Sequence, residues 1–298
     1  MNADNCDLLA ITYVGSSKYG FYKNFSTEVN RLHASLKKYN ICLKVYDSAE
    51  LKKLVKFPDT NLFYFLTRYG AGAWFWKPLI ISHSLKTNRA KILLYLDADC
   101  VVLKDPRLAI EEGLRDSDVN VFKQNVSLDC WISNRALKHL GLNVFDAHRI
   151  TLLTAGIILV RNSKDSLSFM NTWADTMRNP KVLLHPIFAP ARRKHRHDQA
   201  VLSALVGTGK LKCGVMNSGF YSLGDESLEW EIEHAWVGTG NLNSTSHTMG
   251  NLQRLNSITD YYFLFAYDVI KSILITPVHY FAYCAAKKTR QFRIENHG

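Results

Sequence analysis

No stretch of this 298-residue chain contains about 18 uninterrupted apolar residues, which argues against an ordinary membrane-spanning helix. The first residues, MNADNCD, lack the basic run and apolar core of a secretory signal peptide, so we expect a chain that is not exported. There is no C-x-x-C pair among the six cysteines, which argues against a zinc site or a thioredoxin-like motif. We therefore expect the cysteines to act as small buried hydrophobic residues in a reducing, cytosolic compartment.

The sequence also lacks internal repeats, low-complexity segments and any Walker or dinucleotide-binding fingerprint. Acidic residues are in the minority, with 26 Asp and Glu against 37 Lys and Arg, and the net charge is +11. This excess indicates an anionic partner such as a nucleotide, a nucleic acid or an acidic lipid. Hydrophobic residues make up 47% and charged residues 21%, which is typical of a folded globular protein and excludes general disorder.

Strand and helix patterns alternate in the first half of the chain, which predicts an α/β fold. Apolar or alternating runs predict strands at residues 8–14, 41–46, 91–102, 119–123 and 156–160. Helical spacing predicts helices at residues 25–39, 74–85, 131–140, 166–177 and 197–206. No shift in composition marks a domain boundary before about residue 255.

The C-terminal tail, residues 259–298, differs in composition from the rest. Aromatic and aliphatic residues dominate 261–286, and a basic cluster follows, made of Lys287, Lys288, Arg290 and Arg293. An amphipathic stretch that ends in cations predicts a helix lying on a membrane surface, where lipid phosphates meet the basic end. The alternative is a C-terminal helix docked on the core of the domain.

Two carboxylates, Asp97 and Asp99, follow the apolar residues of the strand predicted at 91–102. Side chains alternate along a strand, so the pattern predicts that both point the same way at its C-terminal end, where open α/β sheets place their ligands. With little positive charge beside them in sequence, they would repel each other unless a cation joined them. Mg²⁺ and Mn²⁺ prefer such oxygen ligands, so the pattern predicts a divalent metal site.

Four motifs, in this order and spacing, resemble glycosyltransferases of the GT-A fold: GAGAWFWKP at 70–78, ILLYLDADCVV at 92–102, TAGIIL at 154–159 and HDQ at 197–199. The resemblance implies one Rossmann-like α/β domain with a mixed central sheet, which we place at residues 1–258. It also implies a metal-dependent hexosyltransferase that moves a sugar from a nucleotide-sugar, usually a UDP-sugar, to a glycan or lipid-linked glycan. The Ala-Gly with a downstream Asp-Gln is most similar to families that retain the anomeric configuration.

The resemblance further implies roles for individual residues. Asp198 and Gln199 would lie near the anomeric carbon as the catalytic pair, and Gly156 would leave room for the donor sugar. Contacts to the donor and its metal would come from Thr12, Tyr13, Lys77, Asp97, Ala98, Asp99, Ala155 and Gly156. For Lys77 the alternative is a surface lysine whose stem covers an aromatic ring.

The resemblance implies that a late histidine joins Asp97 and Asp99 as the third ligand of Mn²⁺ or Mg²⁺. His247, in a polar segment that could fold over the diphosphate, is favoured, and His234 is the alternative. Either histidine could instead be a surface residue or a hydrogen-bonded core residue.

Two regions remain open at this level. Related enzymes often carry a Trp-Thr-Lys-like string after the strand near residue 120, whereas this chain has Cys130-Trp131-Ile132-Ser133 there. The basic run from Arg192 to Arg196 precedes Asp198, and it is either a solvated loop or a holder of an anionic donor or acceptor.

The expected partners are a nucleotide-sugar, a glycan acceptor and an anionic membrane surface, without nucleic acid. We expect a cytoplasmic protein, peripheral on the inner face of a membrane. One alternative is a nucleotidyltransferase, which also places carboxylates and a metal on an α/β sheet. Another is a non-catalytic nucleic-acid-binding protein, for which only the net charge of +11 argues.

Overall fold

The structure is a computed structural model, and it describes residues 6–15, 26–54, 73–184, 195–216, 220–222 and 236–239. The tail predicted at 259–298 and both candidate histidines, His234 and His247, lie outside these described residues. The domain boundary predicted at residue 258 lies outside them as well.

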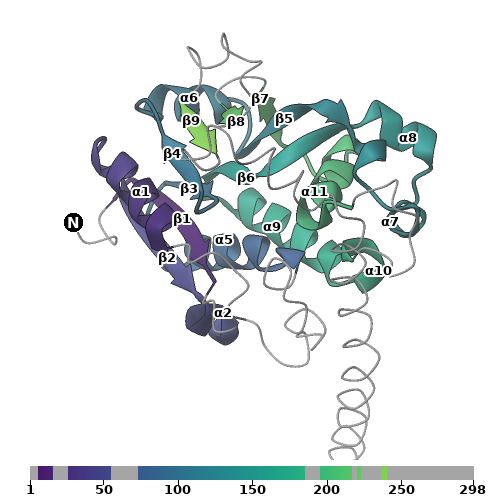
Figure 1. Cartoon of the computed structure of the whole chain (residues 1–298), viewed down its shortest axis with the longest axis horizontal. Coiled ribbons are helices and arrows are strands. Elements are labelled where there is room, and N and C mark those ends of the chain that lie inside the picture. Colours follow the sequence, from purple (N-terminus) through teal and green to yellow (C-terminus); the bar gives the residue numbers. More distant parts are fainter. Residues whose placement is uncertain are drawn as a thin grey trace, which may run out of the picture. The chain divides into compact units, whose positions relative to one another are not determined.

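A mixed six-stranded sheet forms the centre of the fold (Figure 1). Its strands, in spatial order, are β2 (Cys42–Asp47), β1 (Leu8–Val14), β3 (Ile92–Leu96), β6 (Thr151–Arg161), β5 (Val119–Ser127) and β7 (Gly214–Met216). Strand β6 runs antiparallel to both of its neighbours, β3 and β5, and the other five strands run parallel to one another. The prediction of an α/β domain with a mixed central sheet is therefore confirmed.

Strand β3 is apolar at every position because helices or strands cover both faces of the sheet. Leu93 and Tyr95 point to one face and belong to one hydrophobic cluster, whereas Leu94 and Leu96 point to the other face and belong to the second. All four side chains are fully buried. The alternation of faces along the strand thus divides the core in two.

The first cluster is covered mainly by helices. Its helices are α2 (Ser48–Leu54), α5 (Trp76–Thr87), α7 (Asn134–Leu140), α8 (Val144–Arg149), α9 (Lys164–Met177), α10 (Pro180–Leu183) and α11 (His197–Gly207). A short 3-10 turn at Leu128–Cys130 links β5 to this group. In Figure 1, α5, α9 and α11 lie along the sheet, and α5 packs on α9 while α11 packs on β6.

The second cluster is covered by two helices and a small sheet. The helices are α1 (Ser26–Lys37) and α6 (Arg107–Gly113), and the three-stranded sheet contains β4 (Cys100–Val102), β9 (Val237–Thr239) and β8 (Phe220–Ser222) in that order. Within the described residues, no helix is both long enough and apolar enough to cross a membrane.

The strand predicted at 91–102 is interrupted, and the interruption lies at the two carboxylates. β3 ends at Leu96, residues 97–99 form a turn, and β4 then joins the small sheet through β9. The turn is closed by the Cys100 N–H, which donates to the Asp97 carbonyl at 3.0 Å. The expectation that 91–102 is one strand is therefore wrong, and strand alternation does not set the directions of the Asp97 and Asp99 side chains, because neither residue is in a strand.

Other element boundaries also differ from the predictions. The helix predicted at 131–140 begins only at Asn134, because the Ser133 side chain caps it by accepting from the Ala136 N–H at 3.2 Å. The strand predicted at 156–160 is longer, Thr151–Arg161, because it pairs with β3 along one part and with β5 along another.

A disulfide joins Cys6 to Cys42, across residues that are 36 apart in sequence. The prediction that all cysteines act as single buried hydrophobic residues is wrong for this pair, and it is also wrong for Cys130, which is free but exposed. The prediction is correct for Cys100, which is a free, buried thiol in the second cluster. Spacing could not reveal the pair, because the two cysteines meet only when β1 aligns with β2, where Leu9 pairs with Cys42.

Candidate active site

Three strands bring the predicted site residues to one edge of the central sheet. β1 and β3 are parallel, with Ile11 paired to Tyr95, so Thr12 and Tyr13 end at the same edge as Asp97. β6 passes this edge in the opposite direction, with Ile157 paired to Leu96. The segments predicted from the first strand, the DAD sequence and the TAG sequence are therefore neighbours in space.

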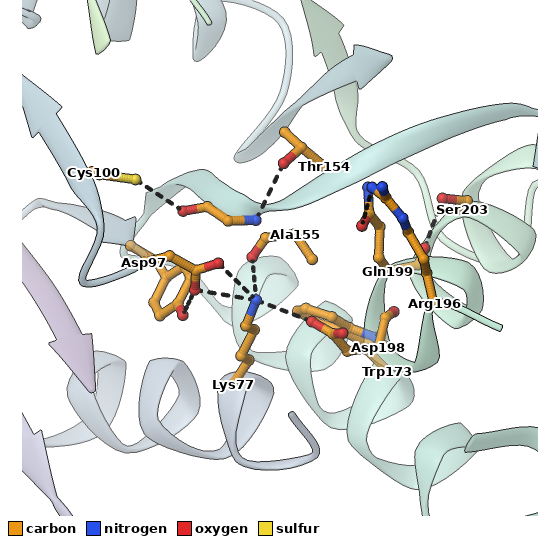
Figure 2. A network of polar contacts seen from close by, with 12 residues as sticks. Lys77, Asp97, Cys100, Thr154, Ala155, Trp173, Arg196, Asp198, Gln199 and Ser203 are labelled. Carbon is orange, nitrogen blue, oxygen red and sulfur yellow. Dashed lines mark hydrogen bonds and ion pairs between the residues drawn. The ribbon is translucent and has the colours of Figure 1, made fainter. Parts of the chain in front are cut away.

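Lys77 lies at the centre of this edge, between the carboxylates of Asp97 and Asp198 (Figure 2). Its Nζ is 3.1 Å from Asp97 Oδ1, 3.1 Å from Asp198 Oδ2 and 3.1 Å from the Ala155 carbonyl oxygen. The residue is only 3% exposed, so its alternative interpretation as a surface lysine is wrong. Four elements meet at one ammonium group, namely the first turn of α5, the end of β3, strand β6 and the first turn of α11.

The charges of this cluster depend on one another. Burial alone would lower the pKa of Lys77, but the carboxylates of Asp198 and Asp97 outweigh burial and raise its pKa above the ordinary value. Burial raises the pKa of Asp198 to about 6, with Asp97 adding to the effect and Lys77 opposing it. Lys77 therefore stays charged, and it is the cation that stabilises the buried carboxylate of Asp198 beside the half-buried carboxylate of Asp97.

Asp97 and Asp99 form the second part of the site. Asp97 accepts a hydrogen bond from the Tyr95 hydroxyl, and its side chain is 32% exposed, so part of the carboxylate still faces outward. Burial and, after it, the charge of Asp97 raise the pKa of Asp99 to about 6, and Lys77 and Arg31 oppose this rise. Arg31 also donates to the Asp99 carbonyl oxygen at 3.2 Å.

This donor set fits a hard divalent cation. The charge of Asp97 raises the pKa of Asp99, so a cation between the two carboxylates would relieve their repulsion, and oxygen is the ligand that Mg²⁺ and Mn²⁺ prefer. Within the described residues, no group of three His, Cys, Asp or Glu side chains is arranged to hold a metal ion. The described part of the chain therefore offers Asp97 and Asp99 as candidate ligands, and a third protein ligand would have to come from elsewhere.

Gly156 lies against the carboxylate of Asp97. A Cβ at this position would be 2.9 Å from Asp97 Oδ2, which is closer than such contacts normally occur. The pairing of β6 with β5 also slips here, since Val121 pairs with Ile158 while the next residue, Phe122, pairs with Thr154. The bulge frees the Ala155 carbonyl for Lys77, and the missing side chain admits Asp97. In this structure Gly156 makes room for a carboxylate, a role that the sequence analysis did not assign to it.

Helix α11 carries the predicted catalytic pair in its first turn. Asp198 is 5% exposed, and its carbonyl accepts from the Trp173 indole N–H at 3.3 Å. The side-chain oxygen of Gln199 accepts from the Arg196 guanidinium at 3.4 Å, and its Nε2 is buried and has no hydrogen-bond partner among the described residues. The two residues differ in environment, because Asp198 is held by Lys77 while Gln199 keeps an unused donor.

Three further predicted residues lie in the same region. Thr12 is fully buried in β1, and its Oγ1 has no hydrogen-bond partner among the described residues. The Tyr13 ring lies 4.2 Å from the Trp76 ring between centroids, and its hydroxyl is 3.2 Å from Ser48 Oγ. Ala98 is buried in the turn between the two carboxylates.

The sequence analysis missed Tyr95, which holds Asp97, and it did not connect Trp131 with Arg196. Tyr95 precedes Asp97 by two residues, so strand periodicity could have found it. Nothing in the sequence indicated that Ala73, Trp74 and His197 have positive φ angles of 56°, 58° and 29°. Ala73 and Trp74 come just before α5, which carries Lys77, and His197 is the first residue of α11, which carries Asp198. Such strain is often concentrated at functional sites.

A sequence profile described as nucleotide-diphospho-sugar transferase matches residues 74–236. This match spans 163 of 298 residues, more than half of the chain, and includes Lys77, Asp97, Gly156 and Asp198. The chain belongs to this family. The transferase is therefore an α/β member of the nucleotide-diphospho-sugar transferases. This membership favours the predicted sugar transferase over the two alternatives, a nucleotidyltransferase and a nucleic-acid-binding protein.

Solved structures similar to this transferase carry sugar-transferase names. Mouse xyloside xylosyltransferase 1 is 12% identical, with a TM-score of 0.47, over 79% of this chain and 98% of that chain. The galactosyltransferase LgtC, solved with donor and acceptor sugar analogues, is 13% identical with a TM-score of 0.43, over 83% and 94%. A glycosyltransferase that glycosylates the major capsid of PBCV-1 is 14% identical with a TM-score of 0.45, over 78% and 93%. No curated protein matches the sequence.

Proposed function

We propose that this transferase is a metal-dependent glycosyltransferase that moves a sugar, most simply from a UDP-sugar, to a glycan or lipid-linked glycan. The observation that carries the proposal is the cluster at the sheet edge within the family match. There, Lys77 joins Asp97, the first residue of the DAD turn, to Asp198, which precedes Gln199. One end of the cluster thus offers ligands for the diphosphate's metal, and the other offers groups for the sugar.

We place the metal at Asp97 and Asp99, with His247 as the third ligand and His234 as the alternative. A divalent cation there would stabilise the negative charge that develops on the diphosphate leaving group. The protein's own part is to hold the carboxylates in position. Tyr95 and Lys77 fix Asp97, and the absence of a side chain at Gly156 lets that carboxylate reach its place.

Asp198 and Gln199 would face the sugar. Lys77 keeps Asp198 close to Asp97, and the Nε2 of Gln199 offers an N–H for an oxygen of the sugar. We infer retention of the anomeric configuration from the resemblance. NMR of the product linkage tests this inference, and an inverted centre formed from an α-linked UDP-sugar would refute it.

The decisive experiment is a screen of UDP-sugars and GDP-sugars with Mn²⁺, in which slow hydrolysis is followed as released nucleoside diphosphate. We expect one sugar nucleotide to be turned over, and we expect EDTA to stop the reaction. Asp99→Ala should lower turnover about 100-fold or more, as expected for a lost metal ligand, while the protein stays folded.

Asp116→Ala is the matched control, because Asp116 is exposed on the segment before β5, and its turnover should equal that of the unmodified enzyme. Undiminished activity of Asp99→Ala, or full activity in EDTA, would contradict the metal assignment. Release of pyrophosphate from a sugar phosphate and a nucleoside triphosphate would instead favour the nucleotidyltransferase.

We also propose that the tail, residues 259–298, brings the enzyme to an anionic membrane surface. The four cations from Lys287 to Arg293 would add roughly 1 kcal/mol each near an acidic surface, and salt would weaken this attraction. Deleting 259–298 should abolish co-sedimentation with acidic liposomes while the melting temperature stays unchanged. If the deletion lowers the melting temperature and the full chain ignores acidic liposomes, the tail is a docked structural helix.

A further inference from the structure

A stacked arginine stands directly beside Gln199. The Arg196 Cζ lies 4.1 Å from the centre of the Trp131 ring, and the Arg196 N–H donates to the Trp131 carbonyl at 2.9 Å. Its Nη1 lies 3.3 Å from Gln124 Oε1 and 3.4 Å from Gln199 Oε1. The guanidinium is thus held by a ring face on one side and by two amide oxygens at its edge.

This geometry decides which way the Gln199 amide points. A guanidinium carries only donors, so the Gln199 atom that faces it must be the oxygen and cannot be the NH₂ group. The NH₂ group is therefore turned away from Arg196, and its Nε2 is buried with no partner among the described residues. A buried amide donor without a partner is unfavourable, and an oxygen of a bound ligand would satisfy it.

We propose that Arg196 is a positioning residue that fixes the Gln199 amide so that its N–H groups face the substrate. Trp131 and Gln124 hold the guanidinium in the plane that this requires. The ligand group that Nε2 would receive is an acceptor oxygen of the sugar, either a hydroxyl or the ring oxygen. This inference rests on the proposed function for its substrate, but the orientation of Gln199 is a property of the free enzyme.

Two regions that sequence reasoning left open acquire a role in this way. Trp131 lies where a Trp-Thr-Lys-like string was expected, and Arg196 is the last residue of the basic run that begins at Arg192. Figure 2 shows Arg196 and Gln199 side by side at the start of α11, next to Asp198. Arg196 supports the site through Gln199, and Trp131 supports it through Arg196.

The kinetic test is Arg196→Lys. Lysine keeps the positive charge but lacks the planar guanidinium, whose N–H groups can donate to two oxygens at once. Turnover of the UDP-sugar that the unmodified enzyme hydrolyses should fall about 10- to 100-fold, as expected for a misplaced reacting group, with an unchanged KM for that donor. Arg149→Lys is the matched control, since Arg149 is exposed on α8, and its kinetics should be unchanged. Unchanged turnover in Arg196→Lys, or a raised KM with unchanged kcat, would overturn the proposal.

A second pair of variants does not depend on Arg196 itself. Trp131→Phe keeps a ring beneath the guanidinium, whereas Trp131→Leu removes it. We expect Trp131→Leu to lower kcat more than Trp131→Phe does, again without a change in donor KM. Equal kcat values for the two variants would contradict the role of the stack.

An NMR measurement separates this proposal from the proposed function. In ¹⁵N-labelled free enzyme, the side-chain amide peaks of Gln199 are identified by their loss in Gln199→Glu. They should move in Arg196→Lys and stay in place in Arg149→Lys. Peaks that do not move in Arg196→Lys would overturn the positioning role. If no sugar nucleotide is turned over but these peaks move as expected, the proposed function fails and the positioning of Gln199 stands.

Discussion

At the scale of single residues, Lys77 decides the character of the site. The buried Lys77 ammonium lies between two carboxylates and compensates for the hydration that these charges lose on folding. It also donates a hydrogen bond to the Ala155 carbonyl. The sequence analysis looked for a cation between Asp97 and Asp99 and proposed a metal ion. The structure adds a second cation, supplied by the chain itself, between Asp97 and Asp198.

Replacing Lys77 should therefore destabilise the whole domain. In Lys77→Met the buried carboxylate of Asp198 and the half-buried carboxylate of Asp97 lose their cation, and we expect the free energy of unfolding to fall by about 3–5 kcal/mol, mainly because of Asp198. Chemical denaturation measures this loss. Lys91→Met is the control, because Lys91 pairs with Asp7 at 3.2 Å on the exposed surface, where such pairs contribute about 0–1 kcal/mol.

A second change tests the cause of that loss. Adding Asp198→Asn to Lys77→Met removes one of the uncompensated charges, so the double variant should be more stable than Lys77→Met alone. A double variant that is less stable than Lys77→Met would show that the lysine stem, rather than its charge, stabilises the site.

Gly156 determines where Asp97 lies. In Gly156→Ala the new Cβ would lie 2.9 Å from Asp97 Oδ2 and force the carboxylate aside. We expect Mn²⁺ affinity, measured by calorimetry, to fall about tenfold or more because a ligand is displaced.

Gly141→Ala is the control for that experiment. Gly141 ends α7 with a φ of 74°, which an alanine adopts at a cost of about 1 kcal/mol. This variant should lose stability but keep its Mn²⁺ affinity. Unchanged Mn²⁺ affinity in Gly156→Ala would contradict the placement of the metal at Asp97.

At the scale of elements, α11 must be held against β6 for the site to form. Ser203 makes this connection, since its Oγ accepts from the Leu153 N–H at 2.8 Å and donates to the Gln199 carbonyl at 2.7 Å. The side chain is fully buried. A single hydroxyl thus joins the bulged strand to the helix that carries Asp198.

Ser203→Ala should lower the free energy of unfolding by about 1–3 kcal/mol, because the Leu153 N–H would remain buried without a partner. Thr176→Ala is the matched control: its hydroxyl donates only to the Thr172 carbonyl of its own helix at 2.9 Å, and its loss should change stability by about 0.5 kcal/mol or less. Equal effects of the two changes on the denaturation midpoint would mean that Ser203 does not connect the elements.

At the scale of the whole molecule, the Cys6–Cys42 disulfide ties the first described residues to edge strand β2. Cross-linking two cysteines 36 residues apart lowers the entropy of the unfolded chain, which corresponds to about 4 kcal/mol in the loop-closure treatment. We expect dithiothreitol to lower the melting temperature of the unmodified protein and to leave that of Cys42→Ser unchanged.

Mass mapping of peptides under non-reducing conditions checks the pair directly. It should show a peptide containing Cys6 bonded to one containing Cys42, with Cys130 free, as the structure has it. Two alkylated thiols at positions 6 and 42 in freshly isolated protein would contradict the disulfide and agree with a reducing compartment.

Much of the fold was predictable because burial leaves a local pattern in the sequence. A strand covered on both faces is apolar throughout, as at Ile92–Leu96, and an amphipathic helix repeats its apolar residues every three or four positions, as at Lys164–Met177. Boundaries were less predictable where a pairing partner decided them. The break after Leu96 is such a case, because Cys100–Val102 pairs with Val237–Thr239 in a different sheet.

The sequence by itself determined the mixed α/β fold and the family of nucleotide-diphospho-sugar transferases, because residue periodicity and the order of short motifs are local properties. Only the tertiary structure decided that Lys77 joins Asp97 to Asp198, that Gly156 accommodates a carboxylate and that Arg196 turns the Gln199 amide. Each of these contacts joins different elements or depends on the path of a bulge or helical turn. Their partners are therefore chosen by strand register and helix packing, which no local pattern in the chain records.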